Sequence, residues 1–167
     1  MSESLPLMLK ELRLPAFGQH YRHFQDQAAE HAWSYSQYLA ALCEQEVAQR
    51  FQSRISNWTH EAKLPRGKSF ATLALTELPQ AAQKKIIALR DNTQWASQAD
   101  NVLLIGPSGV GKSHVAAALG LYLIEQGIRV KWISATALVQ LLQQAKKELD
   151  LMSVMTRLDK YRVLIVD

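Results

Sequence analysis

Eight consecutive residues have the types and the spacing needed to hold a polyphosphate. They fit the pattern G-x-x-x-x-G-K-[ST] and are Gly106, Pro107, Ser108, Gly109, Val110, Gly111, Lys112 and Ser113. The glycines allow positive φ values, so that the backbone can curl and aim several N–H groups at one anion. Lys112 would place a cation on the outer phosphates, and Ser113 would give its hydroxyl to Mg²⁺. This phosphate loop (residues 106–113) predicts the binding of a nucleotide together with Mg²⁺.

The residues around the phosphate loop should form the strand and the helix that position it. Val102–Ile105 is an apolar run bounded by glycine and proline, which is typical of a short buried strand. Val115–Leu119 is rich in alanine and favours a helix, whose first N–H groups and dipole would point at the same anion. A glycine-rich turn that binds nothing is the alternative, and the strand–loop–helix context argues against it.

A second motif is the apolar run Val163–Val166 followed by Asp167. Four apolar residues and an aspartate predict a buried strand that delivers a carboxylate at its C-terminal tip, where ligands collect in open parallel sheets. In P-loop proteins this aspartate supports Mg²⁺. Ser113 and Asp167 are therefore the predicted metal ligands.

Between the two motifs the pattern alternates strand and helix. Gly127 should end the helix after the phosphate loop, Arg129–Ile133 should form a strand, and Ser134 should cap the next helix. Residues 149–158 suggest one more helix. This alternation argues for a parallel α/β sheet.

The first part of the chain should be helical, since no strand signal interrupts residues 1–63. Pro15 should end a first short helix, and Ser34 with Gln37 forms a capping box that opens a long one. Residues 69–78 alternate weakly and look extended, and Pro79 could begin another helix. We predict a helical N-terminal domain (1–68), a connector with a helix (69–98) and the first part of a P-loop domain (99–167).

Composition indicates an ordinary globular protein. Of the 167 residues, 48% are hydrophobic and 20% are charged, and no apolar run is long enough to span a membrane. The N-terminus lacks the basic start of a signal peptide. The single cysteine, Cys43, fits a reducing compartment and lies on an apolar helical stripe, so we expect a cytoplasmic protein with Cys43 in its core.

Positive charge is concentrated in residues 50–68. The segment has five basic residues and one acidic residue, Glu61, so its net charge equals the +4 of the whole chain. Such a patch is expected where a protein contacts nucleic acid, although the charges could equally be the solvated face of an amphipathic helix. The candidate DNA contacts are Arg50, Arg54, Lys63, Arg66 and Lys68.

Three stretches around these motifs resemble one family. G-P-S-G-V-G-K-S-H-V-A-A-A-L-G, G-I-R-V-K-W-I-S-A-T-A-L-V-Q-L-L and L-D-K-Y-R-V-L-I-V-D look like the IstB-like helper ATPases of bacterial insertion sequences. These are similar to the DnaC helicase loaders within the AAA+ class. The N-terminal L-K-E-L-R-L-P and S-Y-S-Q-Y-L-A-A-L-C-E-Q-E also resemble that family's helical leader, so the resemblance covers essentially the whole chain.

The resemblance implies more than the motifs do. Family members bind ATP, assemble on DNA as homo-oligomers and use the nucleotide state to present target DNA to a transposase. Residues 106–113 match the family's phosphate loop, and Asp167 matches its Walker B aspartate. Transposition, DNA binding and a transposase partner follow as expectations.

The sequence departs from the family pattern after Asp167, where a glutamate that polarises the attacking water would follow. The family's later strands, its sensor residue and its arginine finger have no counterpart in residues 1–167. We therefore expect a C-terminally incomplete P-loop domain that binds ATP but hydrolyses it negligibly. We assign no catalytic residue. In AAA+ sheets the missing strands flank Val102–Ile105, so its backbone hydrogen bonds should be unmade and the chain marginally stable and prone to association.

Two functions from different classes remain open at this point. One is the ATP-dependent helper in DNA transposition. The other is a helicase-loader-like adaptor in DNA replication, which would grip a replicative helicase through the N-terminal helices. A small-molecule kinase is disfavoured by the long helical leader and by the lack of an acceptor-site signature.

Overall fold

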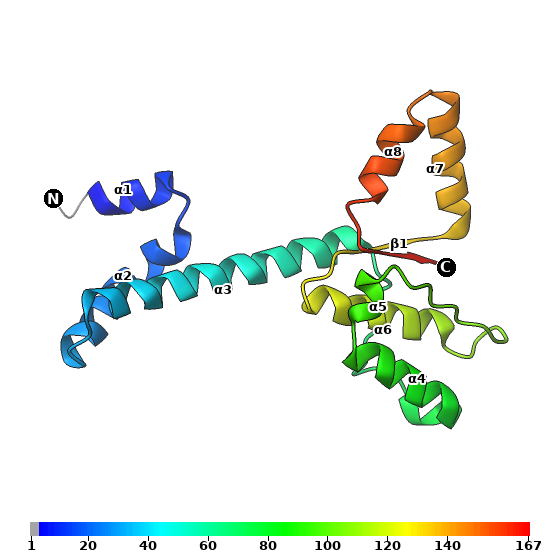
Figure 1. Cartoon of the computed structure of the whole chain (residues 1–167), viewed down its shortest axis with the longest axis horizontal. Coiled ribbons are helices and arrows are strands. Elements are labelled where there is room, and N and C mark those ends of the chain that lie inside the picture. The colour runs from blue at the N-terminus through cyan, green and yellow to red at the C-terminus, as the bar shows by residue number, and fades with distance from the viewer. Residues whose placement is uncertain (1–3) are drawn as a thin grey trace. The chain divides into compact units, whose positions relative to one another are not determined.

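The computed structural model describes residues 4–167, so that the first three residues of the N-terminal stretch lie outside it. The chain folds into two compact units, of which the first ends at Arg54 and the second spans Ile55–Asp167. The three predicted domains, 1–68, 69–98 and 99–167, remain a prediction. Figure 1 shows the elements in chain order, which are α1 (Ser4–Glu11), α2 (Pro15–Glu30), α3 (Tyr35–Ala62), the 3₁₀ helix η1 (Leu75–Glu77), α4 (Gln80–Asp91), α5 (Gln94–Ser97), α6 (Lys112–Glu125), β1 (Val130–Ile133), α7 (Ala135–Lys147), α8 (Leu151–Leu158) and β2 (Val163–Val166).

The first unit is helical, as predicted. Pro15 opens α2, where its missing N–H costs nothing. The predicted capping box opens α3: the Ser34 N–H donates to Gln37 Oε1 at 2.8 Å, and the Gln37 N–H donates to Ser34 Oγ at 3.3 Å. Glu46 of α3 is buried and accepts the Ala16 N–H at 2.9 Å, which joins α3 to the start of α2. The helical signals in the sequence were therefore sufficient for this unit.

The prediction that Cys43 lies in the core is wrong, because its side chain is exposed. Its neighbour Leu42 is only 3% exposed, whereas Leu39 and Val47 on the same apolar stripe are 54% and 68% exposed. Only a narrow line along this part of α3 is therefore covered. Helical periodicity identifies an apolar stripe on a helix. How much of that stripe is buried depends on how wide a surface packs against it.

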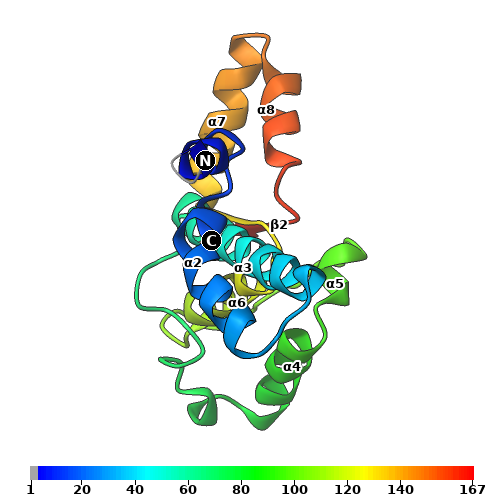
Figure 2. The same cartoon turned by 90° about the vertical axis from the view of Figure 1, so that its left-hand side faces the viewer.

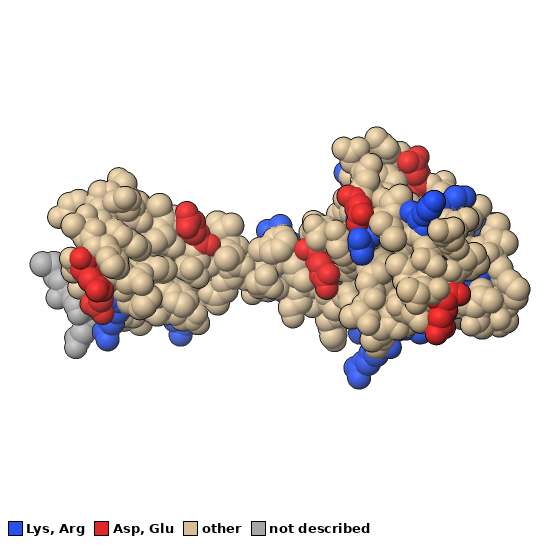
Figure 3. Space-filling model, turned by 90° about the horizontal axis from the view of Figure 1, so that it is seen from below, with Lys and Arg blue, Asp and Glu red and all other residues tan. Residues whose placement is uncertain are grey.

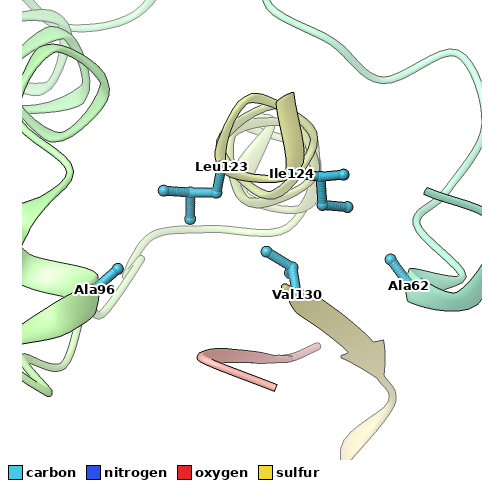
Figure 4. Packing of buried hydrophobic residues seen from close by; sticks show 5 residues of the cluster. All are labelled: Ala62, Ala96, Leu123, Ile124 and Val130. Atoms are coloured by element: carbon cyan, nitrogen blue, oxygen red, sulfur yellow. The ribbon is translucent and has the colours of Figure 1, made fainter. Parts of the chain in front are cut away.

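The second unit has its core on one side of α6. Figure 4 shows Leu123 and Ile124 leaving α6 toward Val130 of β1, with Ala96 of α5 and Ala62 of α3 closing two sides. All five residues are at most 4% exposed. A second cluster packs Val115 and Leu119 of α6 against Ile86 of α4. Because apolar residues occur all around α6, this helix can be covered from several sides at once.

A parallel two-stranded sheet carries the end of the chain. β1 pairs with β2 in the register Val130↔Val163 to Ile133↔Val166. The connection runs through α7 and α8, which lie side by side in both Figure 1 and Figure 2. Ser134 caps α7 by accepting the Ala137 N–H, and Gly127 adopts a φ of 78° after α6, so both predicted helix boundaries are confirmed. The chain is thus an α/β protein with a helical N-terminal part.

Two sequence predictions of extended structure are wrong. Residues 69–78 form turns and η1, because Thr72 accepts the Ser69 N–H and donates to the Gly67 carbonyl, which closes a tight loop instead of a strand. Val102–Ile105 is in no sheet. Within residues 4–167 no strand lies beside it, so its N–H and C=O groups have no ladder to join, in line with the expectation that its hydrogen bonds would be unmade.

None of the helices between residues 4 and 167 combines the length and the apolarity needed to cross a bilayer.

Candidate nucleotide-binding site

The phosphate loop lies between the segment Val102–Ile105 and α6. Gly109 and Gly111 have φ values of 82° and 90°, which confirms the predicted positive φ at two of the three glycines. Gly106 does not adopt a positive φ; a Cβ there would lie 3.4 Å from Val110 Cγ2. Substituting either of the two left-handed glycines would strain the loop, since side chains disfavour that conformation.

The loop leads directly into α6, whose N-cap is Gly111. No side chain caps the helix, and no acidic residue lies in its first turn. The first N–H groups of α6 are therefore left to a ligand or to solvent, and the helix dipole favours an anion there. Because glycine occupies the N-cap position of α6, no serine or aspartate side chain binds these N–H groups, and the helix end stays open to an anion.

Lys112 folds back over the start of the loop. Its Nζ donates to the Gly106 carbonyl at 2.9 Å and to the Pro107 carbonyl at 2.6 Å. The cation is thus held by the backbone of the loop that it was predicted to serve. These two hydrogen bonds also hold the loop's entry, which has no support from a neighbouring strand.

Ser113 and Asp167 come together although they lie 54 positions apart in the sequence. Ser113 Oγ donates to Asp167 Oδ1 at 2.7 Å. Backbone bonds hold Asp167 at the tip of β2: its N–H donates to the Ile133 carbonyl at 3.2 Å, and its carbonyl accepts the Ala135 N–H at 2.9 Å. The structure therefore places a hydroxyl and a carboxylate, both hard oxygen donors, side by side at the first turn of α6.

The donor set suits a cation that takes only part of its ligands from protein. Among residues 4–167, no group of three or more His, Cys, Asp or Glu side chains is arranged to hold a metal. Mg²⁺ commonly binds through one or two protein oxygens and completes its shell with waters and substrate phosphates. Ser113 and Asp167 fit that requirement, whereas a metal that needs an all-protein cage would not be satisfied.

A pocket of about 510 Å³ is lined by residues of β2 and of the segment before the loop. Leu103, Leu104, Leu164 and Ile165 line it, together with Lys112 and Asp167. The two apolar segments that lead into the site therefore do not pair with each other.

The structure splits the five candidate DNA contacts. Arg50 and Arg54 belong to the first unit, and Lys63, Arg66 and Lys68 line one pocket in the second. On the face drawn in Figure 3, basic and acidic side chains are interspersed on a mostly uncharged surface, so that face carries no large basic field.

Arg50 is a structural residue of the first unit. Its guanidinium donates to Glu46 Oε1 at 2.7 Å and to the Arg13 carbonyl at 2.7 Å. Burial works to raise the pKa of Glu46, but the hydrogen bonds from Arg50 and from the Ala16 N–H outweigh it, so the pKa lies below its ordinary value. The charge of Arg50 is thus used to keep a buried carboxylate ionised.

Comparison with known proteins identifies the family. The model of the IstB-like ATP binding protein family matches residues 7–167. The chain belongs to this family. It is 41% identical over 163 residues to an insertion sequence ATP-binding protein of Sinorhizobium fredii, and the match covers 98% of this chain and 55% of the relative.

Two further relatives share the same description. The chain is 30% identical over 163 residues to the ATP-binding protein of the insertion sequence IS21 from Pseudomonas aeruginosa, covering 98% of this chain and 61% of the relative. It is 29% identical over 167 residues to that of the insertion sequence IS5376 from Geobacillus stearothermophilus, covering 100% of this chain and 66% of the relative. This IstB-like chain therefore spans between about half and two thirds of the length of these relatives.

One polar network in this IstB-like protein was not predicted from its sequence. Arg129, beside β1, binds both carboxylate oxygens of Glu61 at 2.6 and 2.7 Å, and Tyr161, before β2, donates to Glu61 Oε1 at 2.8 Å. The hydrogen bond from Arg129 outweighs burial and, with that from Tyr161, holds the pKa of Glu61 below its ordinary value. Burial and Glu61 in turn raise the pKa of Tyr161. The partners are distant in sequence, so no local pattern signals the network.

Proposed function

We propose that this IstB-like protein binds Mg²⁺-ATP at residues 106–113 and passes the nucleotide state to DNA and a transposase, as a helper in transposition. The observation that carries the proposal is the hydrogen bond between Ser113 and Asp167 at the first turn of α6, directly after a loop with two left-handed glycines. A strand–helix turn that binds nothing needs neither a carboxylate at that point nor an uncapped helix end.

Each residue of the phosphate loop has a role in this proposal. The N–H groups of Gly106, of residues 108–111 and of the first turn of α6 would bind the phosphates. Lys112, which donates to the Gly106 and Pro107 carbonyls in the free protein, would contact phosphate oxygens, and Ser113 and Asp167 would hold the Mg²⁺. When bound, the cation neutralises phosphate charge.

Equilibrium binding tests this proposal better than turnover, because the water-orienting glutamate expected from the family is not among residues 1–167. Fluorescent ATP is titrated with and without Mg²⁺ against the wild type, Lys112→Ala and the control Lys84→Ala, which removes an exposed lysine from α4 of the same unit. Losing a charge-assisted hydrogen bond of about 2 kcal/mol should weaken binding about 30-fold in Lys112→Ala. Equal affinities for all three proteins would refute the proposal.

Asp167→Asn separates the metal from the phosphate contacts. This variant should bind ATP in the absence of Mg²⁺ as the wild type does, and it should lose most of the gain that Mg²⁺ provides. If Mg²⁺ strengthens ATP binding equally in both proteins, Asp167 is not a metal residue and the assignment fails.

A helicase-loader-like adaptor is the second candidate, and exposed leucines on α1 and directly after it favour it. Leu7 and Leu12 are 70% and 66% exposed, which leaves an apolar surface in the first unit for a protein partner. The dependence of DNA affinity on salt distinguishes the two functions. A DNA-binding helper should lose affinity steeply as salt rises, whereas an adaptor should bind DNA weakly at any salt concentration.

A further inference from the structure

A second pocket of the Ile55–Asp167 unit lies away from the phosphate loop. It has a volume of about 680 Å³ and is formed by the last turns of α3, the loop after it and Leu121 of α6. Lys63 ends α3 in a left-handed conformation, with a φ of 58°, and Gly67 has a φ of 74°, so the chain turns twice around the pocket. We call it the basic pocket and define it by Lys63, Arg66, Lys68, Ser56, Ser69 and Thr72.

The charge of the basic pocket is of one sign. Lys63, Arg66 and Lys68 line it, and no acidic side chain does. Within residues 4–167 none of the three forms an ion pair. Glu61, the only acidic residue between positions 50 and 68, is held by Arg129 and Tyr161 instead. Three like charges are therefore kept together without an internal counter-ion, which raises the local potential for an anion.

Hydrogen bonds hold the wall of the basic pocket in place. Thr72 Oγ1 donates to the Gly67 carbonyl at 2.7 Å and accepts the Ser69 N–H at 3.0 Å. Its hydroxyl therefore fixes the loop that carries Arg66 and Lys68. A loop ordered before binding loses less entropy when a ligand arrives.

The same loop is tied to the helix that follows the nucleotide site. His114, the residue after Ser113, brings Nε2 to 3.1 Å from Thr72 Oγ1 and to 3.2 Å from the Ser69 carbonyl. Any shift of the first turn of α6 therefore reaches the pocket wall through one side chain. This is a direct physical connection between residues 42 and 45 positions apart.

We propose that the basic pocket binds a backbone phosphate of a polynucleotide, and that His114 couples this site to the nucleotide loop. The coupling rests on the proposed function, whereas phosphate binding in the basic pocket does not require it. Lys and Arg with neighbouring hydroxyls are the groups that contact phosphodiester oxygens and give affinity without base preference. A glycine cradle, which a terminal triphosphate would use, is absent from the described residues that line this pocket.

Oligonucleotide binding tests the site. Fluorescence anisotropy of a labelled DNA duplex is measured at several salt concentrations with the wild type, with Arg66→Ala/Lys68→Ala and with the control Lys84→Ala/Lys85→Ala. The control removes the same charge from exposed positions of α4 in the same unit. The pocket variant should lose about tenfold or more in affinity, and its slope of log K against log salt should fall by about two. The control should stay within about twofold.

One further outcome of this experiment and two other measurements complete the test. Equal losses in the pocket variant and the control would mean that only net charge matters, and would overturn the site. If inorganic phosphate binds through Arg66 and Lys68 while DNA affinity is unaffected by their loss, the ligand is a free phosphate and the proposal fails. The pocket variant should bind fluorescent ATP as the wild type does, so failure of the nucleotide site is seen separately.

The coupling is tested by measuring DNA affinity with and without Mg²⁺-ATP. In the wild type the nucleotide should change DNA affinity by about fivefold or more, a common size for linked sites. His114→Ala should bring that factor close to one while each ligand alone binds normally, and His114→Gln, which retains a hydrogen-bonding side chain, should restore part of it. A factor in His114→Ala equal to that of the wild type would overturn the coupling.

Discussion

Val102–Ile105 and Val163–Val166 are both runs of four apolar residues, and each leads directly into the nucleotide site. The second run pairs with β1 and holds Asp167 in place, whereas the first is in no sheet. Leu103 and Ile105 are 80% and 90% exposed, while Ile165 packs against the core beneath α6. Equal apolar patterns therefore gave unequal structures, and the difference lies in whether a neighbouring backbone is present to receive the hydrogen bonds.

The comparison has a consequence for the site. The backbone of β1 holds β2 in place, so Asp167, the proposed metal residue, is anchored to a sheet. The entry of the phosphate loop is held instead by hydrogen bonds from the Lys112 side chain. One half of the site therefore depends on the fold and the other on a side chain that also serves the ligand.

The largest effect on the free energy of unfolding should come from adding a side chain where α6 packs against β2. Gly120 of α6 is buried, and a Cβ there would lie 2.7 Å from Ile165 Cδ1 and 3.0 Å from Leu64 Cδ2. Gly120→Leu should lower the free energy of unfolding by about 3 kcal/mol, because the added side chain displaces β2 from α6. Gly18→Ala is the control, since no atom lies within 4 Å of a Cβ at Gly18 and helix propensity should raise stability. Denaturant unfolding without loss in Gly120→Leu would contradict this packing.

Amide hydrogen exchange should distinguish the two apolar runs directly. Peptides that span β2 should exchange about a hundredfold more slowly than peptides that span Val102–Ile105, which corresponds to about 2.7 kcal/mol of local opening. The physical reason is that β2 has a ladder with β1 and the other run has none within residues 4–167. Mass spectrometry of the two peptides measures this, and similar rates would remove the distinction.

A matched pair of truncations should give an effect of intermediate size. Ile165→Ala removes a half-buried side chain that packs on the core, and should cost about 2 kcal/mol, near the lower limit for isoleucine truncation. Ile105→Ala changes a side chain that is 90% exposed and should stay within about 0.5 kcal/mol. Thermal melts of both variants test this. A greater loss in Ile105→Ala would show that the first run is covered after all.

The smallest effect concerns the polar network beside the start of β2, for which Val102–Ile105 has no counterpart. Glu61→Gln should cost about 1 kcal/mol at pH 7, since the pair with Arg129 is partly exposed to solvent. The pKa of Glu61 is lowered in the folded protein, so its contribution is present above the ordinary value of 4.5 and is lost as the pH falls below it. Urea unfolding at several pH values should therefore show the wild type and the variant converging in acid. Glu77→Gln, an exposed acid of η1, is the control, and a constant difference across the range would argue against the network.

Local signals were enough to predict much of the fold. The capping box at Ser34, the cap at Ser134 and the glycine at position 127 each act within a few residues, and all three helix boundaries were confirmed. The prediction of β2 was also confirmed, because its apolar run pairs with β1. The failures at residues 69–78 and Val102–Ile105 share a cause, since whether a segment becomes a strand is decided by side-chain bonds or neighbours that a local pattern does not contain.

The candidate site divides in the same way. The phosphate loop and Asp167 follow from spacing, and the structure brings Ser113 and Asp167 into contact, although their roles as ligands remain proposals. The basic segment could be found in the sequence, but the ion pair between Arg50 and Glu46 could not. The contacts of Glu61 with Arg129 and of His114 with Thr72 join residues far apart in the chain, and only the folded structure shows them.

The hydrogen bonds of Lys112 make two carbonyl groups internal competitors of ATP. In the proposed site the Gly106 and Pro107 carbonyls bind the same ammonium group that the phosphates would need, so the affinity for ATP would be the difference between two sets of bonds to one cation. Each 1.4 kcal/mol by which the loop holds its lysine lowers the affinity for nucleotide about tenfold. The hydrogen bonds of Lys112 that keep this loop folded in the free protein would thus also set the concentration at which ATP displaces them.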